Sequence, residues 1–137
     1  MTQIVAQSAI RVQAYRMRKT SAIIWQDAQH QVLFEILDLL KEPTADREVL
    51  YKLEAYTEYH FALEEQYMRE LDYPGRLAHE KSHEKFRREI AELVQVEQEP
   101  DAQFRDIIAT FLTEWLTRHV FGVDKELEDF ILRSSSK

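Results

Sequence analysis

Three prolines divide the chain into segments of about one helix length, and this spacing constrains the fold more than any other feature. Pro43, Pro74 and Pro100 each stand among turn-forming or charged residues, where a helix would end. Between them, apolar residues recur at helical spacing, and no segment alternates with the period of two that a strand needs. The sequence therefore predicts an all-α fold, an up-down-up-down antiparallel four-helix bundle with an N-terminal arm.

The predicted bundle occupies residues 22–133 as one domain, which suits a chain of 137 residues. Residues 1–21 contain scattered apolar side chains and are predicted to form the N-terminal arm, either packed on the bundle or folded as a short extra helix. The serine-rich residues 134–137 are predicted to be a solvated tail or the edge of an excised domain.

Composition and charge exclude several kinds of function. The chain has no cysteine, so disulfides, thiolate metal sites and cysteine nucleophiles are ruled out. Its net charge is -7 without any basic block, which argues against a nucleic-acid partner. No apolar run reaches the roughly 18 residues that span a bilayer, and the start of the chain lacks a signal-peptide core. We therefore expect a cytoplasmic protein with no membrane partner.

All five histidines fall on the predicted apolar faces, where a bundle core normally has leucine or isoleucine. One such histidine would most simply be a hydrogen-bonded core residue. Several together, spread over all four helices and joined by carboxylates, indicate a shared role, because an unpartnered buried imidazole or carboxylate is strongly destabilising. These core-face residues are His30, His60, Glu64, His79, His83 and His119.

Two pairs with i, i+4 spacing indicate a metal site. His79 and His83 are one turn apart on one helix, and His60 and Glu64 repeat the arrangement on the preceding helix, so each pair points the same way. Imidazole and carboxylate ligands without sulfur suit iron, although zinc or manganese would also accept them.

Asp124 follows His119 by five residues, which on a regular α-helix would turn the two side chains about 140° apart. Asp124 can join the site only if the helix bulges between them, and we place that break at Gly122. As a surface acid, Asp124 would need no distortion of the helix.

Five short motifs resemble those of the hemerythrins, in particular the bacterial members. They are Asp27-Ala-Gln-His30 with Leu33-Phe34, His60-Phe-Ala-Leu-Glu64-Glu65-Gln-Tyr-Met68, Tyr73-Pro74, His79-Glu-Lys-Ser-His83 with Phe86, and Trp115-Leu-Thr-Arg-His119 through Asp124. Together they run from about residue 23 to about residue 130. Two departures precede the first helix, where Ala22 replaces a usual glycine and Tyr15 a usual tryptophan. They concern the arm and change no ligand position.

The resemblance implies two iron ions with a bridging oxo or hydroxo group. The residues that would bind them are His30, His60, Glu64, His79, His83, His119 and Asp124. Histidines of the third and fourth helices would bind one iron, those of the first two helices the other, and both carboxylates would bridge. The second iron would then have one ligand fewer, which leaves a position open for O2.

The resemblance also implies an apolar pocket that covers this open position. Its lining would be Leu33, Phe61, Trp115, Leu116 and Val120. Ordinary core packing would explain the same five residues equally well. Asp27 and Glu65 are expected to orient ligand imidazoles, or else to be exposed acids.

The implied function is reversible dioxygen binding, for O2 storage, delivery or scavenging, without catalysis. One alternative is an O2- or redox-sensing domain that acts on a fused or separate signalling partner. Another is a di-iron enzyme that consumes peroxide or NO. Five imidazoles and two carboxylates favour binding, because di-iron carboxylate enzymes use more carboxylates, with Glu-x-x-His pairs.

Overall fold

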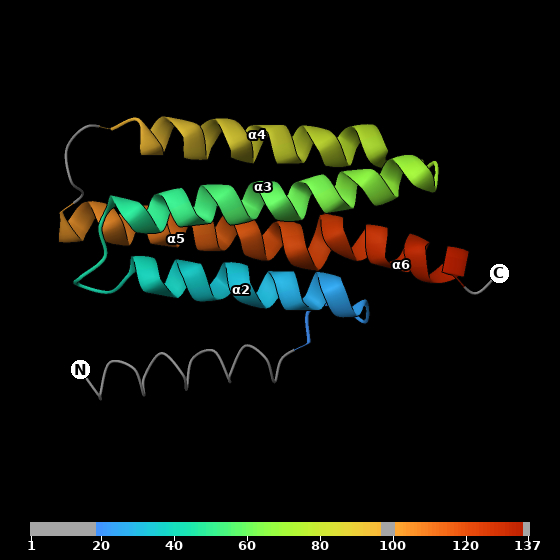
Figure 1. Cartoon of the computed structure of the whole chain (residues 1–137), viewed down its shortest axis with the longest axis horizontal. Helices are drawn as coiled ribbons and strands as arrows, with labels where there is room; N and C mark the ends of the chain where they lie inside the picture. Colours follow the sequence, from blue (N-terminus) through green and yellow to red (C-terminus); the bar gives the residue numbers. More distant parts are fainter. Residues whose placement is uncertain (1–18, 97–100, 136–137) are drawn as a thin grey trace.

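The computed structural model describes residues 19–96 and 101–135, and helices are the only regular secondary structure within these ranges. They are α2 (Ile24–Leu40), α3 (Arg47–Glu70), α4 (Arg76–Val94), α5 (Ala102–Arg118), the π-helical η1 (His119–Val123) and α6 (Asp124–Ser135). Successive long helices run in opposite directions, and η1 and α6 continue the rod that α5 begins (Figure 1). The predicted up-down-up-down bundle is confirmed.

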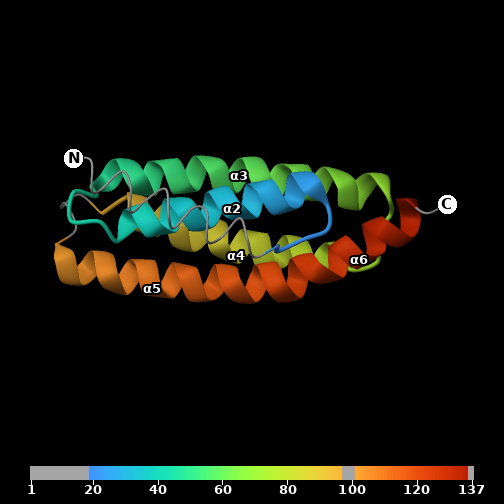
Figure 2. The ribbon, with the colours of Figure 1, turned by 90° about the horizontal axis from the view of Figure 1, so that it is seen from below.

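Viewed along the bundle axis, α2, α3, α4 and α5 occupy the four corners of a square (Figures 1 and 2). Figures 1 and 2 together place α2 beside both α3 and α5, while α4 lies diagonally opposite α2 and packs on α3. Residues 1–18 of the predicted N-terminal arm, Tyr15 included, lie outside the described residues. At the other end, α6 extends to Ser135 and so includes the first residues of the predicted tail. No helix in the described ranges is both long and apolar enough to cross a membrane.

Short polar caps start two of the helices. Asp46 precedes α3, and its carboxylate accepts a hydrogen bond of 3.0 Å from the backbone N–H of Glu48. Asp101 precedes α5 and accepts one of 2.8 Å from the backbone N–H of Phe104. Each bond satisfies a donor that the first helical turn leaves unpaired. Two predicted breaks, those at the first two prolines, are indeed loops between helices.

The bundle core is an apolar cluster to which α2, α3, α4 and the continuous α5–η1–α6 segment all contribute. Its most deeply buried members include Leu33, Leu40, Leu53, Phe61, Ala109, Leu112 and Val120, each at most 1% exposed. Burial of such side chains is the main favourable contribution to folding.

Replacing Leu112 by alanine is expected to lower the free energy of unfolding by about 2–5 kcal/mol, because the side chain is 0% exposed and leaves a cavity. Urea denaturation of the purified variant would measure the change. Ile107 on the same helix is 59% exposed, and its alanine variant should stay within about 0.5 kcal/mol of wild type. Equal losses in the two variants would contradict this description of the core.

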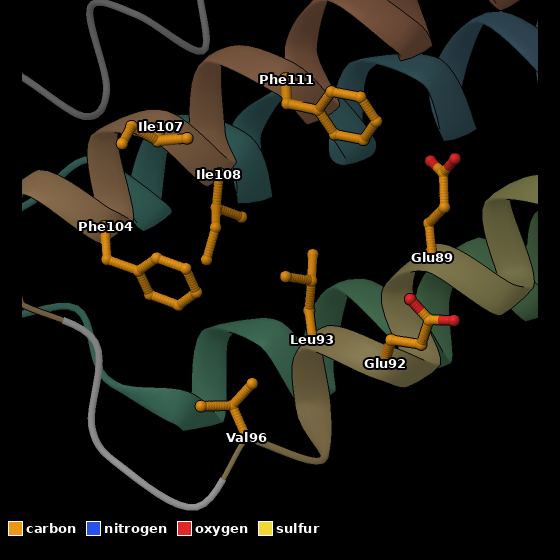
Figure 3. A pocket seen from close by; sticks show the side chains of 8 residues that line it. All are labelled: Glu89, Glu92, Leu93, Val96, Phe104, Ile107, Ile108 and Phe111. Atoms are coloured by element: carbon orange, nitrogen blue, oxygen red, sulfur yellow. The ribbon is translucent and has the colours of Figure 1, made fainter.

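An apolar groove of about 480 Å³ separates the end of α4 from the start of α5. Figure 3 shows the side chains that line it, which are Glu89, Glu92, Leu93, Val96, Phe104, Ile107, Ile108 and Phe111. None of these residues belongs to the predicted metal site, whose α4 members lie nearer the start of that helix. The groove is therefore separate from the site described next.

Candidate metal centre

The structure brings all seven predicted ligand residues together inside the bundle. Each is at most 3% exposed, and α2, α3, α4 and the continuous α5–η1–α6 segment each contribute at least one of them. They are His30 on α2, His60 and Glu64 on α3, His79 and His83 on α4, His119 in η1 and Asp124 at the start of α6. So many buried ionisable groups need partners other than water.

Their ligand atoms form two groups, within each of which all atoms lie no more than 4.8 Å apart. One group is Glu64, His79, His83, His119 and Asp124, and the other is His30, His60, Glu64 and Asp124. The two groups share both carboxylates but no histidine. This is the arrangement expected for a pair of metal ions held by common bridging ligands.

The two oxygens of Glu64 face different groups. Glu64 Oε1 lies 3.1 Å from His83 Nε2 and 3.4 Å from His79 Nε2. Glu64 Oε2 lies 3.4 Å from His60 Nε2. One carboxylate thus presents an oxygen to each side of the site.

Asp124 divides its oxygens in the same way. Its Oδ1 lies 2.9 Å from His119 Nε2 and 3.0 Å from His79 Nε2, whereas its Oδ2 lies 2.8 Å from His30 Nε2. The residue is 1% exposed, so the interpretation of Asp124 as a surface acid is wrong.

A π-helical turn brings Asp124 into the site. From His119 to Val123 the helix is π-helical, and the N–H of Asp124 donates to the carbonyl of His119, five residues back. The wider turn places both side chains on one face, so the predicted bulge is confirmed. Glycine is not sterically required for it, because Gly122 lacks a positive φ and a Cβ there would meet no atom within 4 Å.

Replacing Gly122 by alanine should therefore leave metal binding unchanged. Alanine has the higher helix propensity, so the free energy of unfolding should stay the same or rise by up to about 1 kcal/mol. Metal analysis and urea denaturation would measure the two quantities. A variant that lost metal would show that the π-helical turn depends on this glycine.

The buried polar atoms at the site fit a metal centre. His60 Nε2, both ring nitrogens of His79, His119 Nε2 and Asp124 Oδ1 are buried without a hydrogen bond. His119 Nε2 and Asp124 Oδ1 are only 2.9 Å apart, yet they do not form a hydrogen bond with each other. Unsatisfied buried groups are rare because each is destabilising. Metal ions between these nitrogens and oxygens would satisfy them.

Charges within the site keep both carboxylates ionised, as ligands must be. Burial and the charge of Asp124 act to raise the pKa of Glu64, but His60, His79 and His83 outweigh them and lower it. Burial likewise acts against the charged form of Asp124, and neighbouring imidazoles hold its pKa well below the usual value. Burial acts to lower the pKa of His79, but the negative charges of Glu64 and Asp124, 3.4 and 3.0 Å from its Nε2 atom, outweigh it and raise that pKa to about 9.

Two imidazoles are oriented through acidic residues that the sequence predicts for this role. Glu65 Oε2 lies 2.8 Å from His83 Nδ1, and hydrogen bonds from His83 and Arg87 overcome the effect of burial to lower the pKa of Glu65 to about 2. Asp27 acts indirectly. It accepts a hydrogen bond of 2.8 Å from the hydroxyl of Thr20, which in turn lies 2.9 Å from His30 Nδ1.

Three orienting partners were not predicted, namely Thr20, Gln29 and Ser82. Gln29 Oε1 lies 2.6 Å from His60 Nδ1, and Ser82 Oγ lies 2.9 Å from His119 Nδ1. Gln29 directly precedes one histidine of the site, and Ser82 lies between two others in the sequence. Each of them contacts a histidine of a different helix, and the spacing of residues along one helix does not reveal such a contact.

The five predicted pocket residues belong to the apolar core or pack against it, and two of them contact imidazoles. Leu33, Phe61 and Val120 are 0% exposed, Leu116 is 2% exposed, and Trp115 is half-buried against the same cluster. The Phe61 ring stacks on His83 with centroids 3.8 Å apart, and the Trp115 ring stacks on His119 at 4.7 Å. Aromatic rings thus cover two imidazoles of the candidate site directly.

Comparison with known proteins points to one family. The family model described as "Hemerythrin HHE cation binding domain" matches residues 21–131. A bacteriohemerythrin of Stenotrophomonas maltophilia is 31% identical over 123 residues, covering 78% of this chain and 80% of that protein. A bacteriohemerythrin of Pseudomonas paraeruginosa is 31% identical over 131 residues, covering 84% and 85%. A myohemerythrin of Riftia pachyptila is 33% identical over 98 residues, covering 72% and 76%. No solved structure shows a significant match.

Proposed function

The chain belongs to the hemerythrin family, and we propose that it binds dioxygen reversibly at its di-iron centre, for O2 storage, delivery or scavenging. One observation carries the proposal. The two ligand groups share their carboxylates but have unequal numbers of histidines, three in one group and two in the other. The iron held by the smaller group would have one protein ligand fewer, which would leave room for a small ligand to bind.

We assign the ligands according to these groups. The histidines of α4 and η1 would hold one iron, the histidines of α2 and α3 would hold the other, and both irons would share the two carboxylates. In residues, the first set is His79, His83 and His119, the second is His30 and His60, and the bridges are Glu64 and Asp124. When bound, the iron pair supplies the electrons that O2 takes up and returns.

The protein's own residues hold the imidazoles in place and exclude water. Each of four imidazoles has a partner for its Nδ1 atom, which leaves its Nε2 atom directed at the site. The apolar residues Leu33, Phe61, Trp115, Leu116 and Val120 would keep water away from the site.

Binding is better supported than catalysis. The site has five imidazoles and two carboxylates, whereas di-iron enzymes of the carboxylate class rely mainly on carboxylates. A protein that consumes peroxide or NO would give a different result in the experiment that follows.

The test is an optical spectrum of the iron-loaded protein, reduced without air, then exposed to O2, then freed of O2. Reversible binding predicts a charge-transfer band that appears with O2 and disappears when O2 is removed. Direct conversion to a stable ferric spectrum, with no reversal, would contradict the proposal and favour an oxidising enzyme or a redox sensor.

A further inference from the structure

Gln26 is a buried polar residue that the ligand set does not use. It is 0% exposed and lies on α2 one turn before His30, on the same face of the helix. A buried amide is destabilising unless its donors and acceptor are paired. The partners of Gln26 therefore indicate why an amide is present at a core position.

Two hydrogen bonds hold the amide in one orientation. Ser21 Oγ accepts a hydrogen bond of 3.0 Å from the N–H of Ile23 and donates one of 2.7 Å to Gln26 Oε1. Gln26 Nε2 then donates to Glu64 Oε2 at 2.9 Å. Turning the amide over would set its carbonyl oxygen against a carboxylate, so the two partners fix which end faces the site.

The contacted oxygen lies on the side of the site with fewer histidines. Glu64 Oε2 is the oxygen near His60, whereas Glu64 Oε1 faces His79 and His83. A carboxylate oxygen has two lone pairs, so Oε2 can bind a metal ion and accept the bond from Gln26 together. The hydrogen bond thus acts on the oxygen that would bind the iron of the group with two histidines.

We propose that Gln26 is a positioning residue that orients Glu64 and, by drawing electron density from Oε2, stabilises the ferrous state of the iron pair. This inference rests on the proposed function. A hydrogen bond to an anionic ligand weakens its donation to the metal, and weaker donation destabilises the ferric state more than the ferrous state. Gln26 therefore raises the reduction potential and slows spontaneous oxidation.

The variant Gln26→Met keeps a side chain of similar length but removes the donor. Loss of an outer partner of a metal ligand typically changes affinity or activity about 10–100-fold. We expect about two irons per chain, as in the wild type, and a redox equilibrium shifted about tenfold toward ferric, which is about 59 mV for a one-electron step. Spontaneous oxidation should be faster. Gln66→Met, at an exposed position, should change neither quantity.

The measurements are iron content, midpoint potential by spectroelectrochemistry, and the rate of oxidation in air. A purely structural role would lower stability without moving the potential. Two bound irons with an unchanged potential in Gln26→Met would overturn the inference while leaving the proposed function intact. Failure of the wild type itself to load two irons would instead contradict the proposed function.

A measurement on the unmodified protein covers the case in which the variant does not fold. Gln26 and Gln66 both donate to a glutamate carboxylate, but only Gln66 is exposed. In the metal-free protein, the side-chain amide protons of Gln26 should exchange with solvent much more slowly than those of Gln66, as seen by NMR. Equally fast exchange would overturn the inference.

Discussion

Replacing Glu64 by alanine is expected to reduce the bound iron from two ions per chain to one or none. Glu64 is 0% exposed, and its two oxygens face the two ligand groups separately. If Glu64 bridges the irons as proposed, removing it would take one ligand from each iron and leave the nearby imidazoles with one anionic partner fewer. Since loss of even an outer partner weakens metal binding about 10–100-fold, loss of a shared ligand should weaken it by at least about 100-fold.

Metal analysis after anaerobic loading would measure this effect, and circular dichroism would show whether the bundle still folds. Glu64→Gln keeps the size of the side chain without its charge and separates ligation from cavity formation. Glu58 is a suitable control because it is on the same helix and is 56% exposed. Glu58→Ala should retain both irons. Two irons and normal O2 binding in both Glu64 variants would refute its role as a bridge.

Replacing Leu116 by alanine is expected to leave the iron content unchanged but to speed oxidation to the ferric state by about tenfold or more. Leu116 is 2% exposed and belongs to the apolar cluster that also contains Leu33, Phe61 and Val120. A smaller side chain there opens space for water near the site, and water promotes loss of bound oxygen with the irons left oxidised. The decay of the oxygenated spectrum in air-saturated buffer would give the rate.

Leu112→Ala provides the matched control for this variant. Leu112 is buried one turn earlier on the same helix but is not among the predicted pocket residues. Both variants remove the same atoms from the core, so they should lose similar stability, yet only Leu116→Ala should oxidise much faster. If the two variants oxidised at the same rate, the protection would come from general rigidity of the bundle and not from the pocket lining.

The fold and most of the site could be predicted from local spacing. Helix ends follow from proline, and the direction of a side chain follows from the helical period, so the pairs His79 with His83 and His60 with Glu64 were recognisable along the chain. The need for a bulge before Asp124 was predictable for the same reason. These features depend on backbone geometry within one helix.

Only the tertiary structure decided how side chains of different helices meet. It divides the oxygens of Glu64 and Asp124 between two groups, and it forms the turn before Asp124 as a π-helix with no steric need for Gly122. It also pairs Gln26 with Glu64, 38 residues away in the sequence. Sequence spacing determines which face of its own helix a residue occupies, whereas its partner depends on how helices far apart in the chain pack together.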